Sequence, residues 1–209
     1  MGGVDATDGG TDAAGQPAFV PMKTGHLAFL ASDAWADMLR SDLLPWLTQS
    51  RDLGGHVLEI GPGPGRTTDL LRERASRVTA LELDEHLAAA LESRMASTNV
   101  AVVRGDATAI DLPGVVFSAV TCFHVLHHVP SVELQDRLLA ETCRVLEPGG
   151  SLLLADAVDL AEVRSRHEAE GETFLPLDPG TLEHRLRSAG FADAAVEVRG
   201  YQLLVSARK

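Results

Sequence analysis

The residues best suited to chemistry lie in a glycine-rich turn with an acidic residue just before it. Residues 57–68 read Val-Leu-Glu-Ile-Gly-Pro-Gly-Pro-Gly-Arg-Thr-Thr, so an apolar strand that ends at Ile60 enters a turn with glycine at every second position. Glycines let a ligand approach the backbone closely. The helix that begins near Arg66 directs its free N–H groups toward the same crevice. The pattern predicts a ligand-binding turn.

The spacing and the charge of this turn discriminate between ligands. A dinucleotide-binding turn would have its third glycine at position 66, where this chain has Arg66. Glu59, just before the turn, would repel a pyrophosphate but could help to hold a ligand with an ammonium group. Both features favour a cationic nucleoside without phosphate, such as S-adenosylmethionine, over NAD.

Two further acidic residues follow the next two predicted strands. Glu82 comes 21 residues after Gly61, at the end of Val-Thr-Ala-Leu-Glu. A carboxylate there could accept hydrogen bonds from both hydroxyls of a ribose. Asp106 follows the third strand within Gly-Asp-Ala and could accept from an adenine amine. The alternative for Asp106 is a turn in which it bonds its own backbone.

The elements that must position these residues alternate between strands and helices. Strands are predicted at 56–60, 77–81, 100–104, 119–123, 151–155, 194–199 and 201–207. Their nearly continuous apolar runs are typical of a parallel sheet covered on both faces. Gly200 alone separates the last two strands, which leaves no room for a crossover helix, so these two must pair antiparallel. The predicted fold is α/β, a doubly wound, mostly parallel, seven-stranded Rossmann-like sheet with an antiparallel C-terminal hairpin.

The chain divides into three predicted regions. Residues 1–20 form a disordered tail rich in Gly, Ala, Asp and Thr, residues 21–52 form an N-terminal helical cap, and residues 53–209 form the α/β domain. Helical spacing of apolar residues in the cap predicts a helix with Ser32 or Asp33 as its N-cap. This helix is either a lid over the ligand or a cover for an edge of the sheet.

Composition bears on the partners and on the location. Eighteen Lys and Arg against 30 Asp and Glu give a net charge of −12 without a basic stripe, so we expect no nucleic-acid substrate. The chain has no apolar run of the roughly 20 residues that a membrane-spanning helix needs. Because the N-terminus also lacks the features of a signal peptide, we expect a cytoplasmic protein. Cys122 and Cys143 are expected to be buried without a catalytic role.

Five ordered motifs resemble the class I methyltransferases, in particular small methyltransferases of the type 11 kind, over roughly residues 57–207. They are Glu-Ile-Gly-Pro-Gly-Pro-Gly at 59–65, the strand that ends in Glu82, Gly-Asp-Ala at 105–107, Phe-Ser-Ala-Val at 117–120 leading to Val-Leu-His-His-Val at 125–129, and Arg-Val-Leu-Glu-Pro-Gly-Gly at 144–150. Two positions depart from the family pattern. Ser118 stands where the family often has Asp, and Glu147 where it often has a basic residue.

The resemblance implies a cofactor and a role for each motif. The cofactor is S-adenosylmethionine, the acceptor is a small molecule or a lipid, and a homodimer is a possible assembly. The implied contacts of the cofactor are Glu59, Gly61, Gly63 and Gly65 at the methionine part, Glu82 with Leu83 at the ribose, Asp106 with Ala107 at the adenine, and Phe123 with His124 near the reactive methyl.

The mechanism follows from the cofactor, because its sulfonium is already activated and the protein has mainly to align the acceptor and exclude water. A general base is needed only for some acceptors. We prefer His124 for this role and expect His127 and His128 to be structural or to line the pocket. No metal site is expected, because these three histidines lack a fourth partner at the usual spacing.

Two alternative functions and the role of one segment stay open. An NAD(P)-dependent oxidoreductase is disfavoured by the turn spacing, by Glu59 and by the C-terminal hairpin, and a cofactor-binding module that has lost catalysis is not excluded. Residues 157–178 are long enough to contain an acceptor-binding loop. Arg164, Arg166 and His167 in this segment could meet an anionic acceptor, or they could lie on a solvated helix face.

Overall fold

The computed structural model describes residues 22–43, 45–47, 53–112, 114 and 116–209. The tail predicted for residues 1–20 and the end of the predicted cap at 48–52 lie outside the described residues. The strands are β1 (His56–Ile60), β2 (Arg77–Glu82), β3 (Val100–Arg104), β4 (Phe117–Phe123), β5 (Leu146–Ala157), β6 (Asp193–Arg199) and β7 (Gln202–Arg208). The helices are α1 (Thr24–Leu30), α2 (Asp33–Met38), the π-helical η1 (Leu39–Leu43), α4 (Arg66–Leu71), α5 (Glu85–Met95), the 3-10 helix η2 (Leu126–His128), α6 (Val132–Val145), α7 (Ala161–Glu170) and α8 (Pro179–Ser188).

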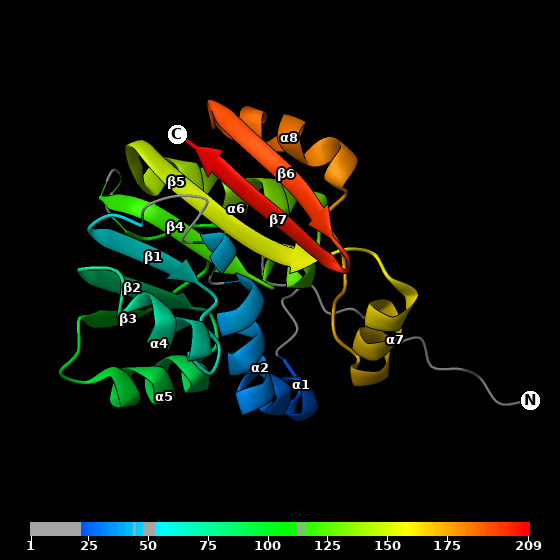
Figure 1. The fold of residues 1–209 in the computed structure, drawn as a ribbon, viewed down its shortest axis with the longest axis horizontal. Helices are drawn as coiled ribbons and strands as arrows, with labels where there is room; N and C mark the ends of the chain where they lie inside the picture. The colour runs from blue at the N-terminus through cyan, green and yellow to red at the C-terminus, as the bar shows by residue number, and fades with distance from the viewer. Residues whose placement is uncertain (1–21, 44, 48–52, 113, 115) are drawn as a thin grey trace, which may run out of the picture.

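The seven strands form one sheet in the order β3-β2-β1-β4-β5-β7-β6 (Figure 1). β1 pairs in parallel with β2 and β4, β2 with β3, and β4 with β5. β7 runs antiparallel to both β5 and β6, so the predicted C-terminal hairpin and the mostly parallel sheet are confirmed. From β1 the chain adds β2 and then β3 on one side, and it then returns to add β4 on the other side of β1. The crevice at the carboxyl ends of β1 and β4 is therefore the topological switch point, where ligands of such sheets bind.

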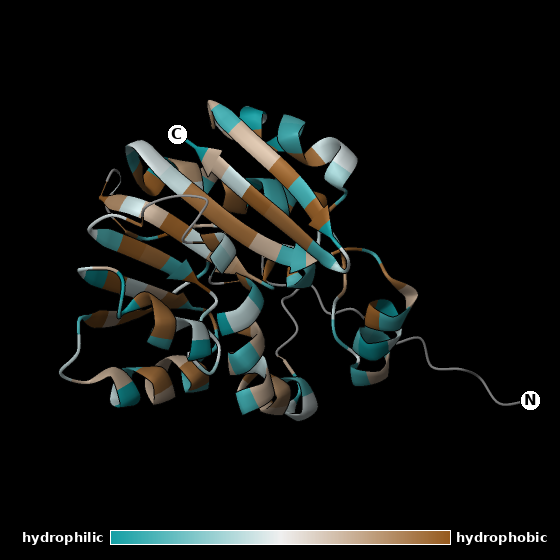
Figure 2. Ribbon diagram, in the orientation of Figure 1, coloured by the Kyte–Doolittle hydropathy of each residue, from teal (hydrophilic) through white to brown (hydrophobic). Residues whose placement is uncertain are grey.

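Alternate residues of the strands supply two hydrophobic layers, one on each face of the sheet. Leu58, Val120 and Leu152 belong to the layer that includes apolar side chains of α6 and α8. Their neighbours Val57 and Leu153 belong to the other layer, with residues of α2, η1 and α4. The strands β4, β5 and β7 consist largely of hydrophobic residues, while much of α7 is hydrophilic (Figure 2). The central strands β1, β4, β5 and β7 are mostly buried, as their apolar runs predict, whereas the edge strands β3 and β6 are more exposed.

β4 and β5 differ most from the predicted boundaries, while β2, β6 and β7 are shifted or extended by one residue. α6 ends at Val145 and β5 starts at Leu146, before Pro148-Gly149-Gly150 and before the predicted strand start at residue 151. Leu146 pairs with Phe117, and the register between β4 and β5 shifts before the pair of Ala119 and Ser151. A bulge thus absorbs the proline and glycines at the beginning of the strand.

The N-terminal helices and the cysteines agree with the sequence. Ser32 is the N-cap of α2, because its hydroxyl accepts a hydrogen bond from the amide of Trp35 at 3.2 Å. Cys122 and Cys143 are both free and buried. In the part of the chain that the structure describes, every helix is too short or too polar to cross a membrane.

Candidate active site

A cavity of about 320 Å³ lies at the carboxyl ends of the parallel strands. The turn after β1 forms one side of it, and the segments after β2 and β3 continue this side. The segment after β4 and the start of α6 form the opposite side, and residues of the N-terminal helices cover it. Four strand ends thus contribute to one chamber at the switch point of the sheet.

The cavity brings together most of the residues predicted to bind a cofactor or to act in catalysis. Those in its lining are Gly61, Gly63, Glu82, Leu83, Asp106, Ala107, Phe123 and His124. Glu59, just before the turn, and Gly65, at its end, lie outside the lining. Cofactor contacts by all of these residues stay a prediction.

The glycines of the turn differ in what their small size allows. Gly63 has a φ of +53°, and a Cβ atom added there would meet nothing within 4 Å, so its backbone faces open space. A Cβ atom at Gly61 would lie 2.5 Å from the Val125 side chain, and one at Gly65 would meet Arg94. Gly63 therefore provides the close approach to a ligand, and the other two glycines allow the turn to pack.

Glu82 both lines the cavity and holds the turn. Its Oε2 accepts a hydrogen bond from the amide of Gly63 at 3.0 Å, and its Oε1 accepts from the amide of Asp84 at 2.9 Å. A carboxylate has about four acceptor positions, so it can still accept from ribose hydroxyls. Burial raises the pKa of Glu82 above its usual value. A ligand that donates hydrogen bonds here would favour the ionised form.

Glu59 lies beneath the turn and is only 2% exposed. Its Oε2 accepts a hydrogen bond from the hydroxyl of Thr68 at 2.6 Å. Burial raises the pKa of Glu59 to about 8, so the carboxyl is mostly protonated at neutral pH without a ligand. Its attraction for an ammonium group thus depends on losing this proton, which the sequence did not reveal. Thr68, the partner, follows the turn in the sequence but was not predicted to have a role.

Asp106 forms the turn that was one of its two predicted alternatives. Its Oδ1 accepts hydrogen bonds from the amide of Thr108 at 2.7 Å and from the Thr108 hydroxyl at 2.8 Å. This is the turn in which Asp bonds nearby backbone. The same residue lines the cavity. The turn therefore fixes the carboxylate at the end where the adenine contact is expected.

His124 stands at the opposite end of the cavity in an unusual backbone conformation. Its φ is +56°, a left-handed value that non-glycine residues seldom adopt. The ring packs edge-on against Trp35, with 5.2 Å between the ring centroids. Desolvation lowers the pKa of His124 to about 4. The imidazole is therefore neutral at physiological pH and has a nitrogen that can accept a proton.

His127 and Asp156 form a buried pair behind this end of the cavity. Nδ1 of His127 donates to Oδ1 of Asp156, and the side chains are 2% and 1% exposed. Burial alone would raise the pKa of Asp156, but His127 outweighs this effect and the pKa lies below its usual value. Asp156 was missed in the sequence. Its signal was a single acid inside the apolar strand Leu-Leu-Leu-Ala-Asp-Ala.

Residues of the N-terminal segment contribute to the lining of the cavity. Met22, Leu30 and Trp35 belong to the lining. The guanidinium of Arg66, at the start of α4, donates to the carbonyl oxygen of Ala31 at 2.9 and 2.6 Å. The cover is therefore attached directly to the helix that follows the glycine turn. η1 packs against the sheet through buried leucines. The N-terminal segment therefore also covers part of the sheet, which was the alternative to a lid.

Comparisons with known proteins identify the family. Residues 58–154 match the family model described as a methyltransferase domain. A probable ribosomal RNA small subunit methyltransferase A of Halobacterium salinarum is 35% identical over 149 residues, which are 68% of this chain and 45% of that protein. A ubiquinone biosynthesis O-methyltransferase of Dechloromonas aromatica is 28% identical over 117 residues, 54% of this chain and 49% of that protein. The chain thus spans about half of the length of these relatives.

Solved structures agree with the family match. A SAM dependent methyltransferase from Aquifex aeolicus superposes with a TM-score of 0.70 at 19% identity, over 90% of this chain and 99% of that one. An S-adenosylmethionine dependent methyltransferase from Mesorhizobium loti gives a TM-score of 0.66 at 22% identity, over 79% of this chain and 96% of that one. At these identities the likeness concerns the fold.

The fold and the site define a Rossmann-like protein that binds its ligand at the switch point of the sheet. More particularly, residues 58–154 belong to a class I methyltransferase domain whose cofactor is S-adenosylmethionine. The predicted enzyme class and cofactor are thereby confirmed for this domain.

The expectation that nucleic acid is not a substrate is wrong. The relatives with the highest similarity include proteins named ribosomal RNA small subunit methyltransferase A, from archaea and from the bacterium Shouchella clausii. The expectation rested on the net charge of −12. Net charge is a sum over the whole chain, whereas an acceptor is recognised by the few groups around the mouth of the cavity. Charge therefore cannot exclude this class of acceptor.

Proposed function

We propose that this chain transfers the methyl group of S-adenosylmethionine to an acceptor that enters the cavity beside His124. The observation that carries this proposal is the two-ended chamber. One end has Gly63, Glu82 and Asp106, suited to a nucleoside with an amino acid tail, and the other has an aromatic residue and histidines. A methyl donor and an acceptor can therefore meet inside one covered space.

The residues of this chain would contribute mainly by positioning. The cofactor's sulfonium supplies an activated methyl group, and alignment of the acceptor in a closed site can lower the barrier by roughly 7–11 kcal/mol. Leu30 and Trp35 of the cover would exclude water. His124, neutral because its pKa is about 4, would receive the proton from a hydroxyl or amine acceptor as the methyl group is transferred.

Two acceptor classes have support. A small organic or lipid acceptor is favoured by the apolar side chains of Leu30, Leu134 and Leu138 in the lining and by the likeness to a ubiquinone biosynthesis O-methyltransferase. An RNA base is favoured by the relatives named as ribosomal RNA methyltransferases. Both would present one reactive atom to the same end of the cavity.

A labelling experiment tests the function and separates the two acceptors. The chain is incubated with methyl-tritiated S-adenosylmethionine and a cell extract, which is then divided into RNA, lipid and small-molecule fractions. We expect label in one fraction with the native chain and much less with the Glu82→Ala variant. Label in nucleosides after digestion of the RNA would identify RNA as the acceptor. Tight cofactor binding without label in any fraction would contradict the proposal and leave a catalytically inactive binding module.

Calorimetry tests the ligand itself. We expect binding of S-adenosylmethionine and none of NAD, since the turn lacks the dinucleotide spacing. Binding of NAD alone would instead support the oxidoreductase alternative.

A further inference from the structure

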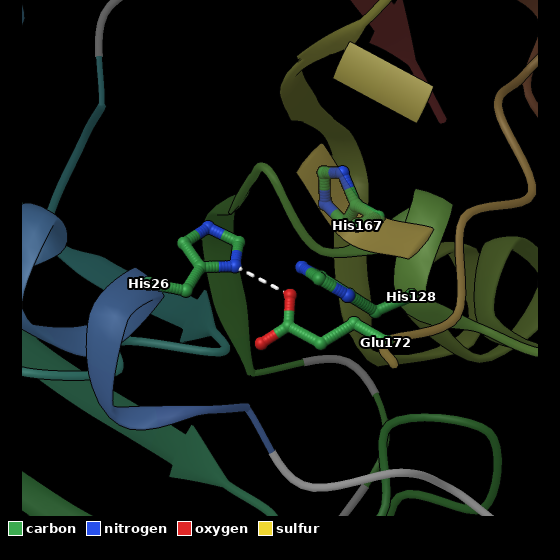
Figure 3. Close-up of side chains that lie close together, drawn as sticks. All are labelled: His26, His128, His167 and Glu172. Carbon is green, nitrogen blue, oxygen red and sulfur yellow. Dashed lines mark hydrogen bonds and ion pairs between the residues drawn. The ribbon is translucent and has the colours of Figure 1, made fainter. Parts of the chain in front are cut away.

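Four side chains of metal-binding type converge next to the cavity. His26 comes from α1, His128 from η2 and His167 from α7. Glu172 comes directly after Gly171, the residue that caps the end of α7. Their ligand atoms all lie within 4.8 Å of one another. Figure 3 shows the three rings and the carboxylate around a common space. We call these four residues the histidine cluster.

Two nitrogens of the histidine cluster are buried without a hydrogen bond. Nε2 of His128 and Nε2 of His167 have no partner among the described residues, and both residues are 5% exposed. A buried polar atom without a partner destabilises the folded chain unless something satisfies it. A metal ion would satisfy both nitrogens at once.

The protonation of these imidazoles suits a metal ion. Nδ1 of His167 donates to the carbonyl oxygen of Val163 at 2.8 Å, which leaves the lone pair of Nε2 free in the neutral ring. This hydrogen bond to a carbonyl is the arrangement that orients many metal-binding histidines.

Glu172 adds a negative charge that is already oriented. Its Oε1 accepts a hydrogen bond from the amide of Lys23 at 2.6 Å, and its Oε2 accepts from Nδ1 of His26 at 2.7 Å (Figure 3). Its side chain is only 2% exposed. These contacts hold the carboxylate beside the imidazoles that would share an ion with it.

A second cavity gives access to the cluster. It has a volume of about 440 Å³, and its lining includes His26, His167 and Glu172. His128 instead lines the cofactor cavity. The cluster therefore stands between the two cavities, and an ion can reach it from the side away from the cofactor.

We propose that His26, His128, His167 and Glu172 bind one divalent transition metal ion of the zinc class. Three imidazole nitrogens and one carboxylate oxygen suit a tetrahedral zinc ion, with bonds of about 2.0–2.2 Å, and imidazole is also a ligand of copper, iron and nickel. Four protein ligands fill the coordination sphere, so the ion has a structural role. It links α1 to η2 and α7, and thus fixes the cover over the cavity.

The proposal differs from the sequence-based expectation of no metal. That expectation considered His124, His127 and His128, which are close together in the sequence. In the structure His127 bonds Asp156, and of the three only His128 belongs to the histidine cluster. The other ligands come from segments that meet only in the folded chain.

Zinc titration tests the site directly. The untagged full chain is stripped with a chelator and titrated with Zn²⁺ alone, with a competing indicator for affinity and mass spectrometry for stoichiometry. We expect one ion per chain. Loss of a residue that only hydrogen-bonds to a metal ligand weakens metal binding by roughly 10–100-fold. His167→Ala and Glu172→Gln each remove a ligand, so each should weaken zinc binding by more than this. His184→Ala, at an exposed histidine of α8, should bind like the native chain. Native and His167→Ala chains of equal zinc affinity would overturn the proposal.

A second measurement needs no variant and is independent of methyl transfer. Cobalt(II) added to the native metal-free chain should give the intense visible absorption of a four-coordinate ion with nitrogen and oxygen ligands, and zinc should displace it. Zinc should also raise the melting temperature of the native chain, since it binds only the folded state. A weak, six-coordinate cobalt spectrum would overturn the tetrahedral site even if the variants failed to fold.

Discussion

The two ends of the cofactor cavity are built in different ways. At the cofactor end, Gly63 and Asp106 follow a strand and Glu82 ends one, and their polar groups are held by hydrogen bonds that involve backbone amides. At the other end, His127 and the histidine cluster contact side chains from distant segments. The residues of the first end come from short sequence motifs, whereas the second end is specified by tertiary packing alone. Substitutions should therefore act locally at the cofactor end and on the fold at the histidine end.

Asp156→Ala should have the largest effect and tests the histidine end. It would leave His127 without its buried partner, and removal of one member of a buried charged pair costs about 3–5 kcal/mol. We expect the free energy of unfolding to fall by this amount in urea denaturation. Asp159→Ala, which removes an exposed carboxylate paired with Arg164 at 2.7 Å, should change it by less than about 1 kcal/mol. Equal effects of the two substitutions would show that the pair is not a determinant of stability.

The same contrast explains how much the sequence could reveal. The strands, the C-terminal hairpin and the glycine turn depend on periodicity and on residues next to one another, and they were predicted closely. The partner of Glu59, the turn-holding bond from Glu82 to Gly63 and the meeting of His26 with Glu172 depend on which elements pack together. His26 and Glu172 are separated by 146 residues, so no local pattern could pair them. The raised pKa of Glu59 likewise follows from burial, which the motif alone does not specify.

His124→Asn should have the next largest effect, on turnover. Asparagine tolerates a φ of +56°, so the backbone should stay in place while the base is lost. We expect kcat to fall by at least about 100-fold, the lower range for general base catalysis, with the acceptor that the labelling experiment identifies. The dissociation constant of S-adenosylmethionine, measured by calorimetry, should not change.

The pH profile provides a further check on His124. Because its pKa is about 4, the ring is in its proton-accepting form throughout pH 5 to 8. Titration of His124 should therefore leave kcat of the native chain flat over this range. Full activity of His124→Asn would exclude the residue as the base.

Glu82→Ala should act on cofactor affinity with little effect on the histidine end. It removes the predicted ribose acceptor and also the partner of the Gly63 amide. Loss of a charged hydrogen bond costs about 1.5–3 kcal/mol, so S-adenosylmethionine should bind at least about tenfold more weakly in calorimetry. Glu85→Ala, which removes an exposed carboxylate paired with Arg104, is the matched control. An unchanged dissociation constant for Glu82→Ala would mean that the ribose is held elsewhere.

Glu59→Gln should show the smallest effect at pH 5, an effect that grows by about 1.4 kcal/mol for each pH unit above it, and it tests whether burial keeps this acid protonated. The folded-state pKa is about 8, above the usual 4.5. Between these values the unfolded chain loses the proton and the folded chain keeps it, so the native protein loses stability as pH rises. Glutamine cannot ionise but can still accept from Thr68. In urea denaturation from pH 5 to 8, the free energy of unfolding of Glu59→Gln should therefore rise relative to that of the native chain with each pH unit. Glu92→Gln, at an exposed site, should show no such rise. Parallel profiles of native chain and Glu59→Gln would mean that Glu59 ionises normally, and the cofactor end would then carry a permanent negative charge beneath its turn.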